Sequence, residues 1–567
     1  MVGYDPFVQA FHAHFTRDSR QRLFCGLDRG LDELPDPSRA EMDAKVAEAR
    51  DLVKALDRIP RKGLPFDQDL DLDLARLVLE AEIHDLTYAF NGRPTSAQRP
   101  TAGVDIGDGL FQMFALDPRP AGDRLRDITS CVEGIPEYLE ALLARLETPV
   151  RRWAGMDVEQ VGGLPDLFAA LEGWARSEEW PDAPRLAAAR ARAEVALLDY
   201  ATRLRALPVT DSFRVGTECA REIVRLRGIE MSLEELHVMA RDFLARVRSE
   251  IDELAGRLAA KYRLPAGTTP DELHRFLCRK YRVQISDGDL DDVLRRYEEE
   301  RERILAFVEA RKLFPIPADQ DMTILRTPKY LVPQIPAGAM TSPPPFRKGT
   351  RRSLVYLTLS EALLDEHTEL SIPGMMLHEG IPGHHLQFAT AGANPSIIRK
   401  HVWSPDLAEG WTTMLEDYMV DVGYAGDLAD EMRFVGKRDI CRLGARVALD
   451  LFFMTGEREY LDVGVDCDLS SDDPFVAAGV LLQTVTGFVD DRVRAELNWN
   501  STERCYPLSY LTGNTLVWAL KRDVIAAKRG QLEGVDLDRE FHRVYLQAGN
   551  MPVSLLRRVF AHEGMLG

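Results

Sequence analysis

Apolar side chains recur at steps of three and four residues through much of the first 313 residues. The pattern is clearest over residues 40–60, 119–147, 184–207, 232–263 and 288–313. This spacing places the apolar side chains along one face of a helix. Ser232 and Glu235 have the spacing of a capping box at the start of the fourth stretch. We therefore predict a mainly α-helical protein.

Two segments carry a pattern that is typical of strands. Residues 353–359, Ser-Leu-Val-Tyr-Leu-Thr-Leu, are the best strand candidate of the chain. The alternation of Asp and Leu over residues 69–74 fits either a strand or the start of a helix, and the pattern alone does not decide between them. A small β-sheet is therefore expected beside the helices.

A proline-rich passage over residues 328–345 interrupts the chain. It predicts a boundary between an N-terminal helical lobe, residues 1–330, and a second lobe, residues 331–567. The chain of 567 residues exceeds one typical hydrophobic core. Two lobes and one large continuous domain both remain open.

Composition and charge limit the classes of function. The net charge of −20 comes from 71 Lys and Arg against 91 Asp and Glu, which disfavours binding to nucleic acid or to an anionic membrane. The seven cysteines are scattered, odd in number and without a Cys-x-x-Cys pair, so we expect reduced thiols. The N-terminal residues show no signal-peptide pattern, and no apolar stretch approaches the roughly 20 residues that span a bilayer. We expect a soluble, cytoplasmic protein.

The most specific chemistry lies in residues 378–385, which read His-Glu-Gly-Ile-Pro-Gly-His-His. With Glu409 further along, His378 and His384 make a set of three ligands for zinc that leaves a fourth position for water. Glu379 is placed to act as the base that takes a proton from this water. The alternative is a group of ordinary histidines near a helix break, but three of the chain's twelve histidines fall within these eight residues.

The spacing of the two histidines differs from the usual His-Glu-x-x-His. Position 382, where the second ligand would stand on the same helix face, is a proline. His384 lies about 240° round an ideal helix from His378, and His385 lies about 10.5 Å along it, so an unbroken helix cannot build the site. Pro382 and Gly383 favour a kink. We predict that this kinked turn brings His384 back to His378.

The second part of the chain carries four motifs. They are the His-Glu-x-x-Pro-Gly-His-His-x-Gln run of residues 378–387; Glu409-Gly410-Trp411 with Glu416; Pro507, Ser509, Tyr510 and Gly513; and Phe541, His542, Gly549 and Pro552. Together they resemble the motifs of a bacterial family of unknown function, DUF885, which is grouped with zinc peptidases of the gluzincin type. The resemblance covers most of the chain and is specific from about residue 345 onward. The third motif has a slightly altered spacing.

The resemblance implies a zincin-like catalytic lobe with a small β-sheet beside the metal-binding helix, one zinc ion per chain and short peptides as substrates. In such peptidases the strand before the metal helix lies along the cleft and binds an extended substrate. Residues 353–359 would be that strand, or else a strand of the core. Arg351, with three basic neighbours, is a candidate for receiving a substrate carboxylate, and solvated surface is the alternative.

Four more side chains receive roles. Tyr510 is the expected donor to the oxyanion, because comparable sites use a phenol or an imidazole there; a buried structural tyrosine is the alternative. Glu416, two turns after Glu409, suits the support of a liganding histidine or is a surface acid. His385 is an alternative ligand or a supporting group, and His542 is a candidate substrate contact.

The chain departs from the family's pattern at two places. Met414 stands where a Tyr is common. Residues 450–458 lack the Arg, Asp and His expected at positions 450, 454 and 458, where this chain has Asp450, Met454 and Arg458. If the missing residues bind substrate, this member has a different specificity or has lost its activity. The proposed metal ligands and the base are all retained.

Three functions therefore stay open. The first is a zinc metallopeptidase that hydrolyses short peptides. The second is a metal-dependent hydrolase of another amide or of an ester. The third is a metal-bound but catalytically silent binding protein. The sequence has no Gly-x-Ser-x-Gly motif, P-loop or Gly-x-Gly-x-x-Gly motif, which argues against a serine hydrolase, an NTPase and a dinucleotide enzyme.

Overall fold

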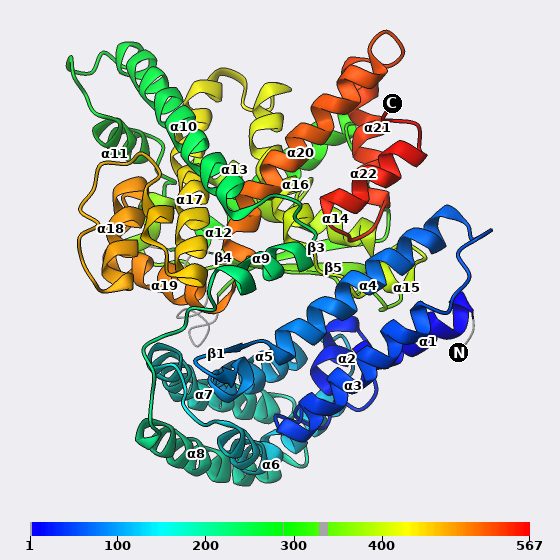
Figure 1. The fold of residues 1–567 in the computed structure, drawn as a ribbon. Helices are drawn as coiled ribbons and strands as arrows, with labels where there is room; N and C mark the ends of the chain where they lie inside the picture. Colours follow the sequence, from blue (N-terminus) through cyan, green and yellow to red (C-terminus); the bar gives the residue numbers. More distant parts are fainter. Residues whose placement is uncertain (1–2, 287–288, 328–337) are drawn as a thin grey trace. The chain divides into compact units, whose positions relative to one another are not determined.

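The computed structural model describes residues 3–286, 289–327 and 338–567 (Figure 1). Contacts within the chain divide it into two compact units. The first comprises Met1–Cys219, Pro344–Arg347 and Ser396–His401, and the second comprises the remaining residues from Ala220 to Gly567. The boundary predicted between residues 330 and 331 falls among residues 328–337, which lie outside the described residues. The contacts divide the chain near Cys219 and place the helices over residues 233–311 in the second unit.

The first unit is built almost entirely of helices. They are α1 (Tyr4–Phe15), α2 (Ser19–Cys25), α3 (Arg39–Leu56), α4 (Phe66–Thr87), α5 (Ala102–Ala115), α6 (Ala121–Arg145), α7 (Arg151–Ser177), α8 (Ala183–Ala206) and the short α15 (Ile397–Lys400). Strands β1 (Ala89–Phe90) and β2 (Arg93–Pro94) form a small hairpin. Residues 69–74, ambiguous in the sequence, lie in α4, where Leu70, Leu72 and Leu74 are all fully buried. The helix therefore buries more than one of its faces.

The second unit contains most of the remaining helices. They are α10 (Leu233–Lys261), α11 (Pro270–Lys280), α12 (Asp291–Arg311), α13 (Ser371–Glu379), α14 (His384–Ala391), α16 (Pro405–Asp421), α17 (Ala429–Thr455), α18 (Pro474–Thr486), α19 (Asp490–Thr502), α20 (Tyr506–Lys528), α21 (Gly534–Gln547) and α22 (Val553–His562); α9 (Thr217–Leu226) crosses the division. The helices predicted from periodicity are confirmed as α3, α6, α8, α10 and α12. The capping box is also present: Glu235 N donates to Ser232 Oγ and Ser232 N donates to Glu235 Oε2.

A three-stranded sheet lies in the second unit. Its strands are β3 (Gln320–Arg326), β4 (Gly338–Thr341) and β5 (Arg351–Leu357), in the order β3-β5-β4. β5 runs parallel to β3 and antiparallel to β4. The predicted strand is thus confirmed two residues early, but it is the central strand and its residues 353–357 are buried. A strand that is paired on both sides has no free edge for an extended substrate, so of the two roles given above the core strand holds.

Helices α16 and α20 pack against each other with their backbones in close approach (Figure 1). A Cβ added at Gly410 would lie 2.5 Å from the carbonyl carbon of Gly513, and one added at Gly513 would lie 2.2 Å from the carbonyl oxygen of Asp406. Two backbones can come this near only where neither residue carries a side chain. Both glycines belong to motifs recognised in the sequence, and their role is to let the two helices touch.

Replacing Gly410 by Ala should destabilise the protein by about 1–3 kcal/mol, because the added methyl group overfills the contact between α16 and α20. The free energy of unfolding in urea measures this effect. Gly436→Ala in α17 is the matched control, since a Cβ there meets nothing within 4 Å. Its effect should stay within about 1 kcal/mol, in the stabilising direction. Equal stability of the two variants would contradict the close contact.

Among the described residues, no helix is long and apolar enough to cross a membrane. All seven cysteines are free thiols, and five of them are buried.

Candidate metal centre

The turn between α13 and α14 brings two histidines together. α13 ends at Glu379, and α14 begins at His384. A Cβ on Gly383 would lie 2.0 Å from the carbonyl oxygen of His378, so the returning chain has room only for glycine. Trp411 Nε1 donates a hydrogen bond of 2.9 Å to the Pro382 carbonyl and fastens the turn to α16. The kinked turn expected from Pro382 and Gly383 is therefore present.

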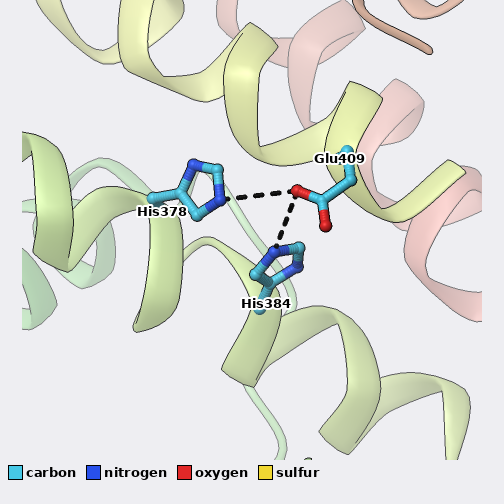
Figure 2. A group of neighbouring side chains, drawn as sticks. All are labelled: His378, His384 and Glu409. Atoms are coloured by element: carbon cyan, nitrogen blue, oxygen red, sulfur yellow. Dashed lines mark ion pairs between the residues drawn. The ribbon is translucent and has the colours of Figure 1, made fainter. Parts of the chain in front are cut away.

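Three side chains converge across this turn. The ligand atoms of His378, His384 and Glu409 all lie within 4.8 Å of one another (Figure 2). Glu409 Oε2 is 3.5 Å from His378 Nε2 and 3.4 Å from His384 Nε2. Zinc bonds of about 2.0–2.1 Å in a tetrahedral site put neighbouring ligand atoms about 3.3 Å apart. The two distances to Glu409 match the spacing that a single zinc ion requires.

The chemistry of the group also fits a cation. Glu409 is 2% exposed, and its Oε2 is buried without a hydrogen-bond partner, as is His384 Nδ1. Burial would raise the pKa of Glu409, but the two imidazoles hold it well below its usual range. Burial would likewise lower the pKa of His378, but Glu409 and Glu416 raise it to about 10. A buried carboxylate oxygen that accepts no hydrogen bond is costly, and a metal ion beside Oε2 would satisfy it.

Glu416 lies where the sequence predicted support for a ligand. Its Oε1 is 2.9 Å from His378 Nδ1. An Nδ1–H that donates to this carboxylate leaves the Nε2 lone pair free for a metal and fixes the orientation of the ring. The pair has the geometry of the carboxylate–histidine support that commonly accompanies zinc ligands.

Two tyrosines of α20 flank the same carboxylate. Tyr506 donates a hydrogen bond of 3.0 Å from its hydroxyl to Glu409 Oε1. Tyr510 stands one helical turn later, with its ring stacked on that of Tyr506 at 5.7 Å between centroids. Burial and the charge of Glu409 raise the pKa of both phenols, which are therefore protonated. Sequence reasoning identified Tyr510 but missed Tyr506, although the four-residue spacing places both on one helix face.

An aromatic layer extends from the three ligands toward solvent. It consists of Phe388, Trp403, Trp499, Tyr506 and Tyr510. Phe388 stacks on the ring of His384 at 5.6 Å and on Trp403 at 5.3 Å. Trp403 is 47% exposed. The layer therefore offers an apolar surface that begins at a proposed ligand and reaches solvent at Trp403.

A family described as "Bacterial protein of unknown function (DUF885)" matches residues 21–560. The chain belongs to this family. No curated protein matches it.

Two solved structures share the fold of this DUF885 protein. One is described as a presumed lipoprotein of unknown function from Shewanella oneidensis, with 19% identity, a TM-score of 0.76, and 98% of this chain and 99% of that chain covered. The other, described as a presumed lipoprotein from Colwellia psychrerythraea, has 15% identity and a TM-score of 0.78, with 99% of this chain and 98% of that chain covered. Identities this low establish the fold alone.

The departures from the DUF885 pattern have structural roles in this chain. Asp450 is fully buried and accepts hydrogen bonds from the backbone N–H of Cys505 at 3.2 Å and of Leu508 at 3.1 Å. It thereby anchors the start of α20, the helix that carries both phenols; burial raises the pKa of this carboxyl to about 7. Met454 is fully buried, and Arg458 donates to the Ser471 carbonyl. None of the three changes replaces one of the converging ligands.

The structure does not bring His385 to the ligand group. Its ring is fully buried, with Nδ1 2.7 Å from Ser353 Oγ and Nε2 2.6 Å from Gln320 Oε1. Both nitrogens are thus occupied by residues of the sheet, and burial lowers the pKa of the ring to about 4. His385 cannot be an alternative ligand in this arrangement. It ties α14 to β3 and β5 and supports the position of its neighbour His384.

His542 is also a core residue. It is fully buried, stacks on Phe314 at 4.3 Å and has its Nδ1 2.9 Å from the Leu313 carbonyl oxygen. Burial lowers the pKa of this imidazole to about 3, so it is neutral. The ring packs edge to face against Trp411, which holds the turn between the two histidines. The prediction of a substrate contact is wrong, because no surface of His542 is accessible.

Arg351 is paired at the start of β5. Its Nη1 lies 2.7 Å from Asp319 Oδ1, and Arg352 next to it pairs with Asp321. These cross-strand ion pairs connect β5 to β3 and to the residue that precedes it. The structure thus gives Arg351 a partner within the protein, and its role as a substrate contact stays a prediction.

Proposed function

We propose that the protein is a zinc-dependent hydrolase that acts on short peptides. The observation that supports this most is the convergence of His378, His384 and Glu409 at distances of 3.4 and 3.5 Å between ligand atoms. These residues would hold one zinc ion per chain. Zinc, when bound, supplies a Lewis acid and lowers the pKa of a coordinated water towards about 7.

The chain's own residues supply the remaining chemistry. Glu379 is the last residue of α13, directly after His378, and is partly exposed. It would accept the proton of the attacking water and return it to the leaving amine. Tyr510 would donate its hydroxyl proton as a hydrogen bond to the oxyanion, since the hydroxyl of Tyr506 is already bonded to Glu409. Tyr506 is then a positioning residue that holds Glu409.

Two features favour a peptide over another amide or an ester. β4 pairs with β5 on one side, and a Cβ at its Gly338 would lie 3.7 Å from the side chain of Met375 in α13. In the described part of the chain, no strand pairs with the other side of β4. An extended peptide could pair there, close to the helix that carries His378. The aromatic layer could receive an apolar side chain of the same peptide.

Two alternatives remain, and they differ from the proposal in their substrate or in having no hydrolytic activity. A hydrolase of a non-peptide amide or an ester would use the same metal centre. A silent binding protein was suggested by the altered residues 450–458, but Asp450 and Met454 serve the core and the start of α20. The replacements at these two positions have structural roles, and the silent alternative is decided by the substrate panel.

Metal analysis and a substrate panel test the proposal together. We expect about one zinc per chain, and cleavage of short peptides that stops with a chelator and returns with zinc. Hydrolysis of esters alone would support the second function, and zinc without any hydrolysis would support the third. Protein that never met a chelator and yet contains no metal would contradict all three.

The location of the protein is a separate prediction. The two structural relatives are described as presumed lipoproteins. A lipid-anchored or exported location is thus the alternative to the cytoplasmic one expected from the composition. Fractionation of cells that produce the full-length protein distinguishes the two.

A further inference from the structure

Two arginines of α17 stand one helical turn apart beside the proposed centre. Arg446 donates from Nε and Nη2 to both oxygens of Glu496, at 3.0 and 2.7 Å. Its guanidinium lies 4.7 Å from the ring centroid of Tyr510 and 4.9 Å from that of Trp499. Arg446 is thus held rigidly against the aromatic layer, and Glu496 does not use its Nη1.

Arg442 is less well compensated. Its side chain is only 14% exposed, and among the described residues its hydrogen bonds go to the carbonyl and the carboxylate of Asp439 in its own helix turn. The carboxylate of Asp439 is 44% exposed. Ion pairs with such exposed partners contribute little stability, because water screens them. A largely buried guanidinium is therefore left with a weak counter-charge.

The charges around Arg442 also leave its positive charge incompletely balanced. Arg446 and Arg492 act on it as like charges, and Glu416 and Glu496 act as opposite charges. These two carboxylates are already bonded, Glu416 to His378 and Glu496 to Arg446. Burial and the neighbouring arginines lower the pKa of Arg442 to about 10. An additional anion beside Arg442 and Arg446 would relieve this imbalance.

We propose that Arg442 and Arg446 bind the free C-terminal carboxylate of the peptide substrate, so that the enzyme removes residues from the C-terminus. The inference rests on the proposed function. Guanidinium groups match the geometry of a carboxylate. Arg446 contacts the ring of Tyr510, which stacks on Tyr506, the donor to Glu409, so Arg446 lies near the proposed centre. Arg442 stands one helical turn before it in α17.

Arg446 lies next to the tyrosines that flank the proposed centre. Tyr510 separates Arg446 from Tyr506, whose hydroxyl is bonded to Glu409. An extended peptide advances about 3.3–3.6 Å per residue. A substrate whose scissile carbonyl is near Tyr510 and the ligands would therefore place its carboxylate at Arg446 one or two residues later. Arg351, the candidate from the sequence, is paired with Asp319 instead.

A matched pair of peptides tests this inference on the zinc-loaded enzyme. One tripeptide is used as its free acid and as its C-terminal carboxamide, and kcat/KM is measured for each. Loss of a charge-assisted pair of hydrogen bonds corresponds to about 10- to 100-fold, so wild type should prefer the acid by that factor. Arg442→Gln should bring the ratio close to one. Arg438→Gln, one turn earlier in α17 and paired with Asp271, should keep the wild-type ratio.

The kinetic comparison and a binding measurement separate failure of the carboxylate site from failure of the proposed function. Equal kcat/KM for acid and carboxamide in wild type would overturn the inference and leave the hydrolase intact, and this comparison needs no variant to fold. If neither peptide is cleaved, the proposed function fails, and calorimetry with N-acetylphenylalanine and its carboxamide decides whether the carboxylate site exists. We expect the acid to bind more tightly and to lose this advantage in Arg442→Gln. Equal binding of the two compounds would overturn the site itself.

Discussion

Glu379→Gln should lower kcat for peptide hydrolysis by about 10²- to 10⁴-fold and leave the zinc content unchanged. Glutamine has the same shape as glutamate but cannot accept the proton of the attacking water. Glu379 is not among the three residues whose ligand atoms converge, so its replacement should not release the metal. Steady-state kinetics at saturating zinc, together with metal analysis of the same preparation, measures both effects.

Glu416→Gln is the matched control for this prediction. Glu416 contacts His378 Nδ1 and does not approach the position of the substrate carbonyl in our proposal. Its replacement should weaken zinc binding by about 10- to 100-fold, with turnover recovered when zinc is in excess. Full turnover in Glu379→Gln would remove the assignment of the base, and loss of zinc from that variant would make Glu379 a ligand.

Gly383→Ala is the second change with a large expected effect. The new methyl group would lie 2.0 Å from the His378 carbonyl oxygen and 2.3 Å from that of Leu377, so the turn must open. Overpacking of this kind costs about 1–3 kcal/mol. If the cost falls on the arrangement that binds the metal, zinc affinity drops by about 10- to 100-fold. Competition with a chelating dye measures the affinity.

Gly374→Ala provides the comparison within the same helix. Gly374 lies in α13, one turn before His378, and a Cβ there meets nothing within 4 Å. This variant should bind zinc as the wild type does. Equal zinc affinities for Gly383→Ala and Gly374→Ala would show that the tight turn does not set the distance between the two histidines.

Much of the helical structure could be predicted because its signals are local. The apolar spacing of residues 232–263 and the Ser232–Glu235 capping box together located α10 to within a residue or two. Residues 69–74 could not be assigned, because alternating Asp and Leu is also the pattern of a strand. The pattern fits a helix only where the helix is buried on several sides, as α4 is. The sequence likewise indicated β5 but not its neighbours. Its central position depends on the pairing with β3 and β4, which no local pattern encodes.

The residues of the proposed centre likewise fall into a part that local sequence predicts and a part that only the fold brings together. His378, Glu379, His384 and the glycine of the turn lie within one short motif, so their proximity could be reasoned from helix geometry. Tyr506 reaches Glu409 from almost a hundred positions away along the chain, and only the crossing of α16 and α20 brings them together.

Two other histidines show the converse. His385 and His542 lie inside recognised motifs, but their rings point into the core. A motif identifies residues that matter to the fold and to the site alike. It does not distinguish the two until burial and partners are known.

Anomalous scattering at the zinc absorption edge tests most directly whether the side chains of residues 378, 384 and 409 bind one ion. Crystals grown with stoichiometric zinc should give a single strong peak about 2.0–2.2 Å from Nε2 of both imidazoles and from the carboxylate. A peak elsewhere in the molecule, with these three side chains free of metal, would contradict the account.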